Sequence, residues 1–346
     1  MNLHLQNLVK EDVMRGKPMI TRLLVGTLLL SLVASVPLAS ASVQARQDEQ
    51  LQIAFSVPGL NFPFFVHMMN IARDKAAELD VELIELDGQD NSATQSAGIE
   101  TMIAQGVDGI VISPKDVEAL APAIQAATDA GIPVVTVDRN VTGATTLAHV
   151  GADNVRGGEK QGEYLLEILP DGGQVIELQG SVGASPAIDR SAGFNSVIEG
   201  NDAYEIVFQQ TAGFARDQGL TVTEQALQAN PEVDAIVAAN DDMAFGAAEA
   251  ASGAGLEIPI IGFDALPEAL QAVQDGTLAA TVEQFPGGQT SGAMEILVNY
   301  LRDGTEPAEH DTFIEPELIT VDNLGEAERA EEAGIAAGTP VATPAA

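Results

Sequence analysis

The chain carries the same short pattern twice, 126 residues apart. Val107-Asp108-Gly-Ile-Val recurs as Val233-Asp234-Ala-Ile-Val, and each copy precedes an Ile-Pro pair and an apolar run that ends in Asp138 or Asp264. An apolar run of strand length beside a segment of helical periodicity is typical of a parallel α/β unit. Since open α/β sheets bind ligands at the carboxyl ends of their strands, we predict two similar halves whose aspartates project into one cleft.

Residues 1–45 have the pattern of a cleavable signal peptide. A basic segment ending at Arg22 precedes an apolar stretch over residues 23–38, and small-residue sites follow up to Ala45. The apolar stretch is short for a permanent membrane span, which is the less favoured alternative. Because there is no cysteine for a disulfide or a lipid anchor, the mature protein is expected to be soluble, periplasmic or secreted, and not embedded in a membrane.

The composition is strongly acidic. The chain has 51 Asp and Glu against 15 Lys and Arg, a formal net charge of −36 at pH 7. Such a surface repels nucleic-acid phosphates and anionic lipid headgroups. We therefore predict no nucleic-acid partner and interpret most of the charge as a solvated surface.

Apolar runs of strand length alternate with helical segments along residues 53–321. These runs are too apolar for a sheet with one face in water, so helices are expected to cover both faces of each sheet. The predicted fold class is α/β, with two similar doubly wound parallel-sheet lobes. After Asn323 the sequence becomes rich in Ala and Glu without a clear strand or core signal, and residues 324–346 are predicted to be a flexible tail.

Four segments in the second half of the chain carry a resemblance to a known family. They are Thr211-Ala-Gly-Phe-Ala-Arg-Asp-Gln-Gly-Leu-Thr-Val222, Asn240-Asp-Asp-Met-Ala244, Gly262-Phe-Asp-Ala-Leu-Pro267 and Ala280-Thr-Val-Glu-Gln284. Each is a weak signal alone, but in this order they are a strong one. The chain resembles the periplasmic ribose-binding protein family, the type I sugar-binding proteins of ABC transporters, over residues 50–322. Within that family it is particularly similar to inositol- and polyol-binding members.

The resemblance implies a three-segment hinge near Asp153, Phe285 and Phe313. The first lobe then consists of residues 46–152 plus 286–312, and the second lobe of residues 153–285 plus 313–323. The implied function is that of an extracytoplasmic solute-binding protein, which captures a monosaccharide, cyclitol or sugar alcohol between its lobes. The ligand is then delivered to the permease subunits of an ABC transporter, and the protein is expected to be a monomer.

The side chains needed to hold a ligand rich in hydroxyl groups are present. A carboxylate accepts hydrogen bonds from neighbouring hydroxyls, a guanidinium donates to two oxygens and an amide does both, while apolar sugar faces stack on aromatic rings. Comparison with the family pattern assigns the ligand site to Phe62, Phe64, Phe65, Ser113, Asp138, Arg139, Arg190, Phe214, Asn240, Asp264 and Gln284. Two simpler interpretations stay open, with Asn240 as a helix N-cap and Phe65 as a core residue.

Three first-lobe positions depart from the pattern of ribose binders. Those proteins carry Asn where this chain has Phe62 and Ser113, and Ser where it has Pro58. A lost partner leaves a ligand hydroxyl without its hydrogen bond, at a cost of roughly 1 to 3 kcal/mol. Ribose in the usual pose is therefore expected to bind poorly, and a different pentose, a hexose, a cyclitol or a linear polyol is favoured.

Three other functions share parts of this pattern. A glycosidase would use two carboxylates, but Arg139 and Arg190 are expected to favour the charged forms of Asp138 and Asp264 and to leave no obvious proton donor. The effector lobe of a LacI-type repressor has this architecture, but here the chain starts with a leader segment instead of a DNA-binding one. A sugar receptor for chemotaxis or a sensor kinase remains an alternative to transport. The four His are scattered, so we predict no metal site, no cofactor and no enzymatic activity.

Overall fold

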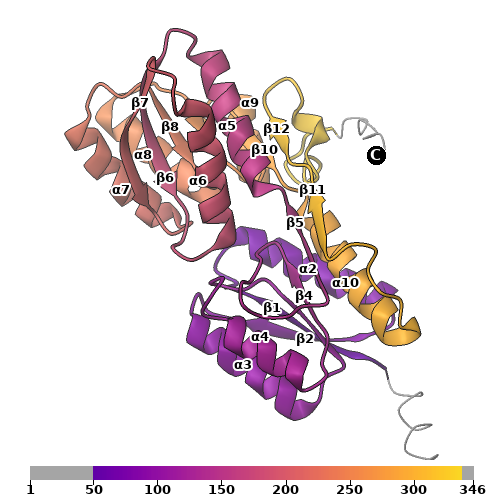
Figure 1. Cartoon of the computed structure of the whole chain (residues 1–346). Helices are drawn as coiled ribbons and strands as arrows, with labels where there is room; N and C mark the ends of the chain where they lie inside the picture. The colour runs from indigo at the N-terminus through magenta and orange to yellow at the C-terminus, as the bar shows by residue number, and fades with distance from the viewer. Residues whose placement is uncertain (1–49, 337–346) are drawn as a thin grey trace, which may run out of the picture. The chain divides into compact units, whose positions relative to one another are not determined.

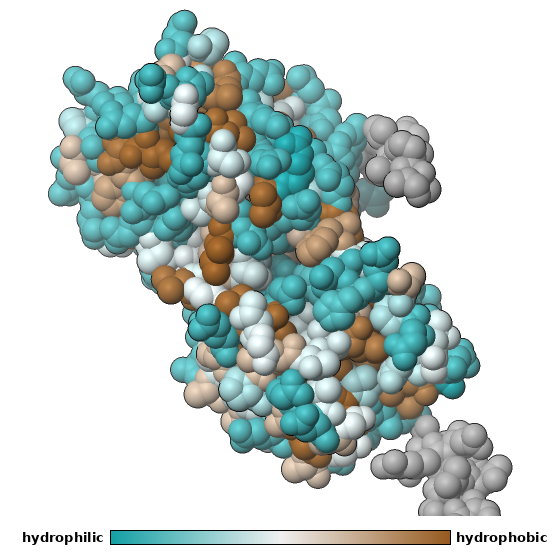
Figure 2. All heavy atoms as spheres, in the orientation of Figure 1, coloured by the Kyte–Doolittle hydropathy of each residue, from teal (hydrophilic) through white to brown (hydrophobic). Residues whose placement is uncertain are grey.

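Two parallel sheets organise the residues that the computed structural model describes, 50–336 (Figure 1). The predicted signal peptide, residues 1–45, and the last segment, residues 337–346, lie outside the described residues. Hydrophilic residues cover much of the visible face (Figure 2), as the acidic composition predicts. Within residues 50–336, every helix is too short or too polar to span a bilayer.

The first lobe is built on a six-stranded parallel sheet with the strand order β11-β5-β4-β3-β1-β2. Its strands are β1 (Gln52–Val57), β2 (Glu82–Asp87), β3 (Gly109–Ile112), β4 (Val134–Val137), β5 (Ala148–Ala152) and β11 (Asp311–Ile314). Its helices are α2 (Pro63–Glu78) and α10 (Pro286–Asp303) on one face, and α3 (Ser92–Gln105) and α4 (Ala121–Asp129) on the other. Successive side chains of a strand point to opposite faces, so Phe55 packs with the first pair of helices and Ala54 with the second.

The second lobe repeats this arrangement on a four-stranded parallel sheet, β7-β6-β8-β9. Its strands are β6 (Gly173–Gln179), β7 (Tyr204–Thr211), β8 (Ala235–Ala238) and β9 (Ile260–Ile261), and β10 (Thr281–Glu283) forms an antiparallel pair with β12 (Glu317–Ile319). Its helices are α5 (Asn154–Ile168), α6 (Ser185–Ile198), α7 (Arg216–Ala229), α8 (Asp241–Ala254) and α9 (Pro267–Asp275). Val175 packs with α5 and α6, whereas its neighbour Ile176 packs with α7 and α8. Both faces are buried, and the predicted α/β class with two doubly wound lobes is confirmed.

The repeated Val-Asp pattern has the same structural role in both lobes. The backbone N–H of Gln52 donates to Asp108 Oδ2 at 2.8 Å, and that of Gln174 donates to Asp234 Oδ2 at 2.7 Å. In return, the N–H of each aspartate donates to the carbonyl oxygen of the same glutamine, at 2.9 Å in the first lobe and 2.8 Å in the second. Each pattern therefore fixes where a central pair of parallel strands begins, which also aligns their carboxyl ends.

The chain passes between the lobes three times. It does so at Asp153 between β5 and α5, at residues 284–285 between β10 and α10, and at residues 315–316 between β11 and β12. As a result, α10 and β11 pack on the first lobe although they come from the C-terminal part of the chain (Figure 1). The third passage falls after Phe313, because β11 continues to Ile314 beside Ala152 of β5.

Residues 324–336 pack on the protein, so the prediction of a flexible tail is wrong for this segment. Every third residue is buried, namely Leu324, Ala327, Ala330 and Ala333, and the first turn is a short 3₁₀ helix. This packing could not be predicted from the composition, because small alanine side chains at a spacing of three can pack closely without forming an apolar run.

Glycines bring α5 and α6 into close contact. A Cβ atom on Gly158 of α5 would lie 2.1 Å from the carbonyl oxygen of Arg190, and one on Gly193 of α6 would lie 2.0 Å from that of Val155. The two backbones can approach this closely because neither glycine has a side chain. The contact fixes the position of α6 at Arg190, one of the predicted ligand-binding residues.

We expect Gly158→Ala to lower the free energy of unfolding by about 1 to 3 kcal/mol, because the new methyl group would overlap the carbonyl group of Arg190. Gly253→Ala in α8 is the matched control, since no atom lies within 4 Å of its Cβ position. There the higher helix propensity of alanine should stabilise the protein by up to about 1 kcal/mol. Urea denaturation measures both variants, and equal stabilities would contradict the role given to Gly158.

Candidate ligand-binding site

A cavity lies between the lobes, at the carboxyl ends of their strands. It is lined by Phe62, Phe64, Phe65, Asp138, Arg139, Pro186, Arg190, Phe214, Asn240, Asp264 and Gln284. Every residue predicted for the site is in this wall except Ser113, and Pro186 is added to the set. The structure thus brings side chains from both lobes to one enclosed space.

The two aspartates of the sequence repeat occupy equivalent places in the two lobes. Asp138 follows β4 and Asp264 comes shortly after β9, and they are 4% and 5% exposed. Both have a positive φ, 61° and 109°, a conformation that costs of order 1 to 3 kcal/mol in a non-glycine residue. Because surrounding contacts must hold such strain in place, both strand ends are candidate functional positions.

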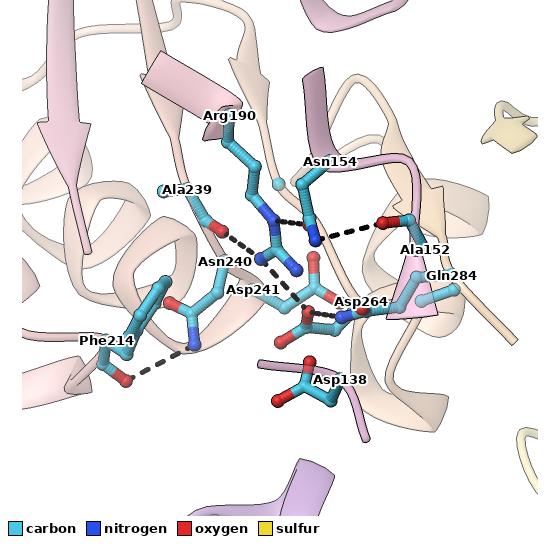
Figure 3. A network of polar contacts seen from close by, with 12 residues as sticks. Asp138, Ala152, Asn154, Arg190, Phe214, Ala239, Asn240, Asp241, Asp264 and Gln284 are labelled. Atoms are coloured by element: carbon cyan, nitrogen blue, oxygen red, sulfur yellow. Dashed lines mark hydrogen bonds and ion pairs between the residues drawn. The ribbon is translucent and has the colours of Figure 1, made fainter. Parts of the chain in front are cut away.

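Arg190 and Gln284 hold the carboxylate of Asp264 (Figure 3). Gln284 Nε2 donates to Asp264 Oδ1 at 2.6 Å, and Arg190 Nη1 lies 3.4 Å from the same oxygen. Arg190 is fixed in turn, because its Nε donates to Asn154 Oδ1 at 2.8 Å and its Nη1 to the carbonyl oxygen of Ala239 at 2.6 Å. The guanidinium is therefore oriented before any ligand arrives.

Asp138 has a comparable set of partners in the first lobe. Ser113 Oγ donates to Asp138 Oδ2 at 2.8 Å, and Arg139 Nε lies 3.7 Å from the same oxygen. Ser113 supports the aspartate in this way and does not line the cavity, so the structure does not place it at the predicted ligand contact. Arg139 lies over the rings of Phe65 and Phe214, 5.1 and 5.5 Å from their centroids.

Burial outweighs the arginines in setting the charge of the two carboxyl groups. It raises the pKa of Asp264 to about 7, although Arg190 opposes the shift, and it also raises the pKa of Asp138 against the effect of Arg139. The arginines favour the ionised forms as expected, but burial has the larger effect on both carboxyl groups. Hydrogen-bond donors of a ligand would replace the missing water and favour the ionised form.

Aromatic rings form the apolar part of the wall. Phe62, Phe64 and Phe65 stand at the start of α2, where Phe65 makes edge-on contacts with Phe64 at 5.3 Å and with Phe62 at 6.2 Å between ring centroids. Phe65 belongs to the hydrophobic core as well as to the cavity wall, so it packs inward and also faces the space predicted for the ligand. Phe214 faces the cavity from the second lobe, and a Cβ on Gly180 would lie 2.1 Å from its ring.

Asn240 combines the two roles considered for it. Its Oδ1 accepts the N–H of Met243 at 3.0 Å, so it is the N-cap of α8, and its Nδ2 donates to the carbonyl oxygen of Phe214 at 3.2 Å while it lines the cavity. The next residue, Asp241, is buried and accepts hydrogen bonds from Thr281 Oγ1 at 2.7 Å and from the backbone of Leu266 at 2.9 Å. These contacts hold the loop that carries Asp264 against α8.

Gln95 is a supporting residue that the sequence prediction missed. It is buried on α3, and its Nε2 donates to the carbonyl oxygen of Ser113 at 2.8 Å and to Ser56 Oγ at 3.1 Å. It lies on the same buried face of the helix as Ile99 and Met102. The sequence held one signal for it, because Gln95 is a polar residue on the helix face that otherwise carries apolar residues.

The lobes contact each other directly at the edge of the cavity. The N–H of Val117 donates to the carbonyl oxygen of Gly183 at 2.8 Å, and the N–H of Asn140 donates to Ser185 Oγ at 3.0 Å. Gly183 has a φ of 79°, and a Cβ there would lie 2.0 Å from Asp116 Oδ2, so this contact requires glycine. We call this arrangement of the lobes closed.

Two doubly wound lobes that enclose a cavity of paired charges and aromatic rings define a two-lobed solute-binding protein. Within residues 50–336, no group of three or more His, Asp or Glu side chains could hold a metal ion. A sequence profile described as a periplasmic binding protein domain matches residues 53–306. The chain belongs to this family.

Curated relatives and solved structures agree with that assignment. The chain is 37% identical over 275 residues to the ribose import binding protein RbsB of Salmonella typhimurium, covering 79% of this chain and 92% of the relative. It is similar to the crystal structure of the Caulobacter myo-inositol binding protein bound to myo-inositol, with a TM-score of 0.79 and 38% identity over 82% of this chain and 98% of that one. A Bacillus halodurans ABC transporter solute-binding protein with bound myo-inositol has a TM-score of 0.77 and 33% identity, covering 81% and 98% of the two chains. The predicted resemblance to ribose- and inositol-binding proteins is confirmed.

We expect the ligand-free protein to become more stable as the pH falls from about 8 to about 6. The pKa of Asp264, about 7, lies above that of an unfolded aspartate, so the folded protein takes up a proton where the unfolded chain does not. Asp264→Asn keeps the shape without the titrating group, and its melting temperature should rise less over the same interval. Scanning calorimetry of both proteins measures this, and identical pH profiles would show that the pKa of Asp264 is not raised.

Proposed function

We propose that the protein captures a small neutral molecule rich in hydroxyl groups between its lobes and delivers it to the permease of an ABC transporter. One observation carries this proposal: Asp138 with Arg139 in one lobe, and Asp264 with Arg190 in the other, line a single closed cavity beside aromatic rings. This donor and acceptor set suits ligand binding without chemical change.

The balance of charge favours a neutral ligand. Two aspartates and two arginines line the cavity, so their formal charges cancel when both carboxyl groups are ionised. A charged ligand would bring an unpaired charge into a site that excludes water, at a cost of several kcal/mol. A sugar, a cyclitol or a sugar alcohol carries no such charge.

Each polar group in the cavity wall can form a hydrogen bond with a ligand hydroxyl group. Carboxylates accept hydrogen bonds, guanidinium groups donate them, and the amides of Asn240 and Gln284 do both. Neighbouring hydroxyls of one ring can therefore satisfy an aspartate and an arginine together. The rings of Phe64 and Phe214 would cover the apolar C–H faces of such a ligand from the two lobes.

The relatives and one residue of the cavity wall narrow the class of ligand. The names of the relatives include ribose and myo-inositol binders, and Phe62 presents a ring where ribose binders have Asn. We favour a cyclitol or a hexose over ribose for this reason.

The mechanism is capture by closure. A ligand would first bind to the first lobe, and closure would then bring Arg190, Phe214, Asn240 and Asp264 onto its other side. Charge-assisted hydrogen bonds in an enclosed site should give a dissociation constant of about 1 μM or tighter, a binding free energy of about −8 kcal/mol. The closed protein, as a monomer outside the cytoplasm, would then dock on the permease.

A thermal-shift screen over pentoses, hexoses, inositols and sugar alcohols tests this function. A ligand that binds the folded protein alone, present at about 100 times its dissociation constant, stabilises it by about 2.7 kcal/mol, so myo-inositol or a hexose should raise the melting temperature by several degrees. The same compound should give no shift with Asp264→Asn, which loses one carboxylate acceptor from the cavity. A screen in which only charged compounds such as amino acids or sugar phosphates stabilise the protein would refute the proposal.

Phe62→Asn should shift the preference toward ribose. It restores the amide that ribose binders carry at this position, and one regained hydrogen bond is worth roughly 1 to 3 kcal/mol, so ribose should bind at least about fivefold more tightly. Phe64→Asn is the matched control, because it removes a neighbouring ring from the same wall and should weaken every ligand. Titration calorimetry with D-ribose and myo-inositol measures both variants. Unchanged ribose affinity in Phe62→Asn would show that this position does not set the preference.

A further inference from the structure

Residues 324–336, which we call the C-terminal strap, connect the two lobes outside the cavity. The strap follows β12 of the second lobe, and Gln271 of α9 in that lobe donates to the carbonyl oxygen of Ala333 at 3.1 Å. On the first lobe, Glu328 Oε1 lies 3.0 Å from Nε2 of His67 in α2. The strap lies beyond residue 306, where the match to the family profile ends.

Glu328 also spans the second passage between the lobes. Its N–H donates to Glu283 Oε2 at 2.9 Å, at the end of β10 in the second lobe. Its carboxylate accepts the N–H of Gly287 at 2.9 and 3.1 Å, at the start of α10 on the first lobe. One residue therefore joins both ends of the passage at residues 284–285, in addition to contacting His67.

Glu283 connects the strap to the backbone of that passage. Its side chain is buried, and its Oε1 accepts the N–H groups of Gln284 at 2.8 Å and Phe285 at 2.7 Å. Phe285 has a φ of 55°, a left-handed conformation that is strained in a non-glycine residue and needs contacts to hold it. Gln284 donates in turn to Asp264 in the cavity wall, so hydrogen bonds run from the strap to the site.

A second side chain reinforces the contact with His67. Glu332 Oε1 lies 3.8 Å from His67 Nδ1, and Arg329 Nη2 holds the other oxygen of Glu332 at 2.9 Å. The side chains of His67 and Glu328 are 10% and 24% exposed. Because they are partly shielded from water, their contact should contribute more than an ion pair on the open surface.

A contact that forms in one arrangement of the lobes shifts the equilibrium toward that arrangement. In this structure the strap contacts coexist with the closed cavity, where Val117 and Asn140 donate to the opposite lobe. We propose that the C-terminal strap favours the closed arrangement through the contact between Glu328 and His67. It would set the ratio of open to closed protein before any ligand binds.

Hydrogen exchange of the ligand-free protein, followed by NMR, tests this proposal. The amides of Val117 and Asn140 report on closure because their acceptors lie on the other lobe. The amides of Ile110 and Ile236 are internal controls, since they donate to carbonyl groups within their own lobes. Glu328→Ala removes the contacts of this carboxylate with His67 and with the N–H of Gly287. It should speed exchange at the two reporters by about fivefold or more and leave the controls unchanged.

Two further variants separate the contact from other effects. His67→Ala removes the contact with Glu328 from the first lobe and leaves the contact of Glu328 with Gly287 in place. It should speed exchange at the same two reporters, and combining it with Glu328→Ala should add little. Glu331→Ala is the matched control on the strap, because Glu331 is exposed and its side chain makes no hydrogen bond or ion pair with residues 50–336. It should behave as the wild-type protein does.

Unchanged exchange at Val117 and Asn140 in both variants would overturn the proposal, as would the absence of protection at these amides in the wild-type protein. If Glu328→Ala also speeds exchange at Ile110 and Ile236, that variant has lost global stability. The exchange rates of His67→Ala then test the proposal. Faster exchange confined to the reporters in His67→Ala then supports the strap, and unchanged exchange refutes it. Because no ligand is added, the outcome is independent of whether the protein binds a sugar.

Discussion

Charged groups buried between two lobes are the constraint on which the rest of the structure depends. Asp138, Arg139, Arg190 and Asp264 are each 5% exposed or less, and taking a charge out of water costs several kcal/mol unless other partners replace the water. Ser113 and the neighbouring arginines replace part of it, and the hydroxyl groups of a ligand would replace more. The raised pKa of Asp264 follows from this incomplete compensation, and the hydroxyl donors of a ligand would favour the ionised form of this carboxyl group.

The same requirement accounts for the backbone strain around the cavity. Asp138, Phe214, Asp264 and Phe285 all have positive φ values, and each lies at the cavity wall or in the passage beside it. A sharp turn after a strand directs a side chain back toward the opposite lobe, which a regular strand end would not do. The hydrogen bonds around Arg190 and the close α5–α6 contact supply the rigidity that keeps such conformations in place.

The fold and most of the cavity wall could be predicted because parallel strands place their carboxyl ends together regardless of side-chain detail. The repeat therefore located Asp138 and the equivalent second-lobe aspartate, and the family pattern located most of the other lining residues. Ser113 lies behind Asp138 and not in the cavity wall, because a sequence pattern fixes a strand end but not the depth of a side chain. Gln95 was missed because its hydrogen-bond partners come from distant segments of the chain. The packing of residues 324–336 was missed because it depends on small alanine side chains and not on large apolar ones.

The strap would add a level of control that is separate from ligand recognition. Closure costs part of the binding free energy, and the apparent affinity decreases as the binding-competent fraction of the protein becomes smaller. Permanent closure would shut the ligand out, so a contact of moderate energy is better suited than a buried one. The contact between Glu328 and His67 lies outside the cavity and is partly exposed. Substitutions there can therefore change the closing equilibrium while every side chain that lines the cavity stays the same.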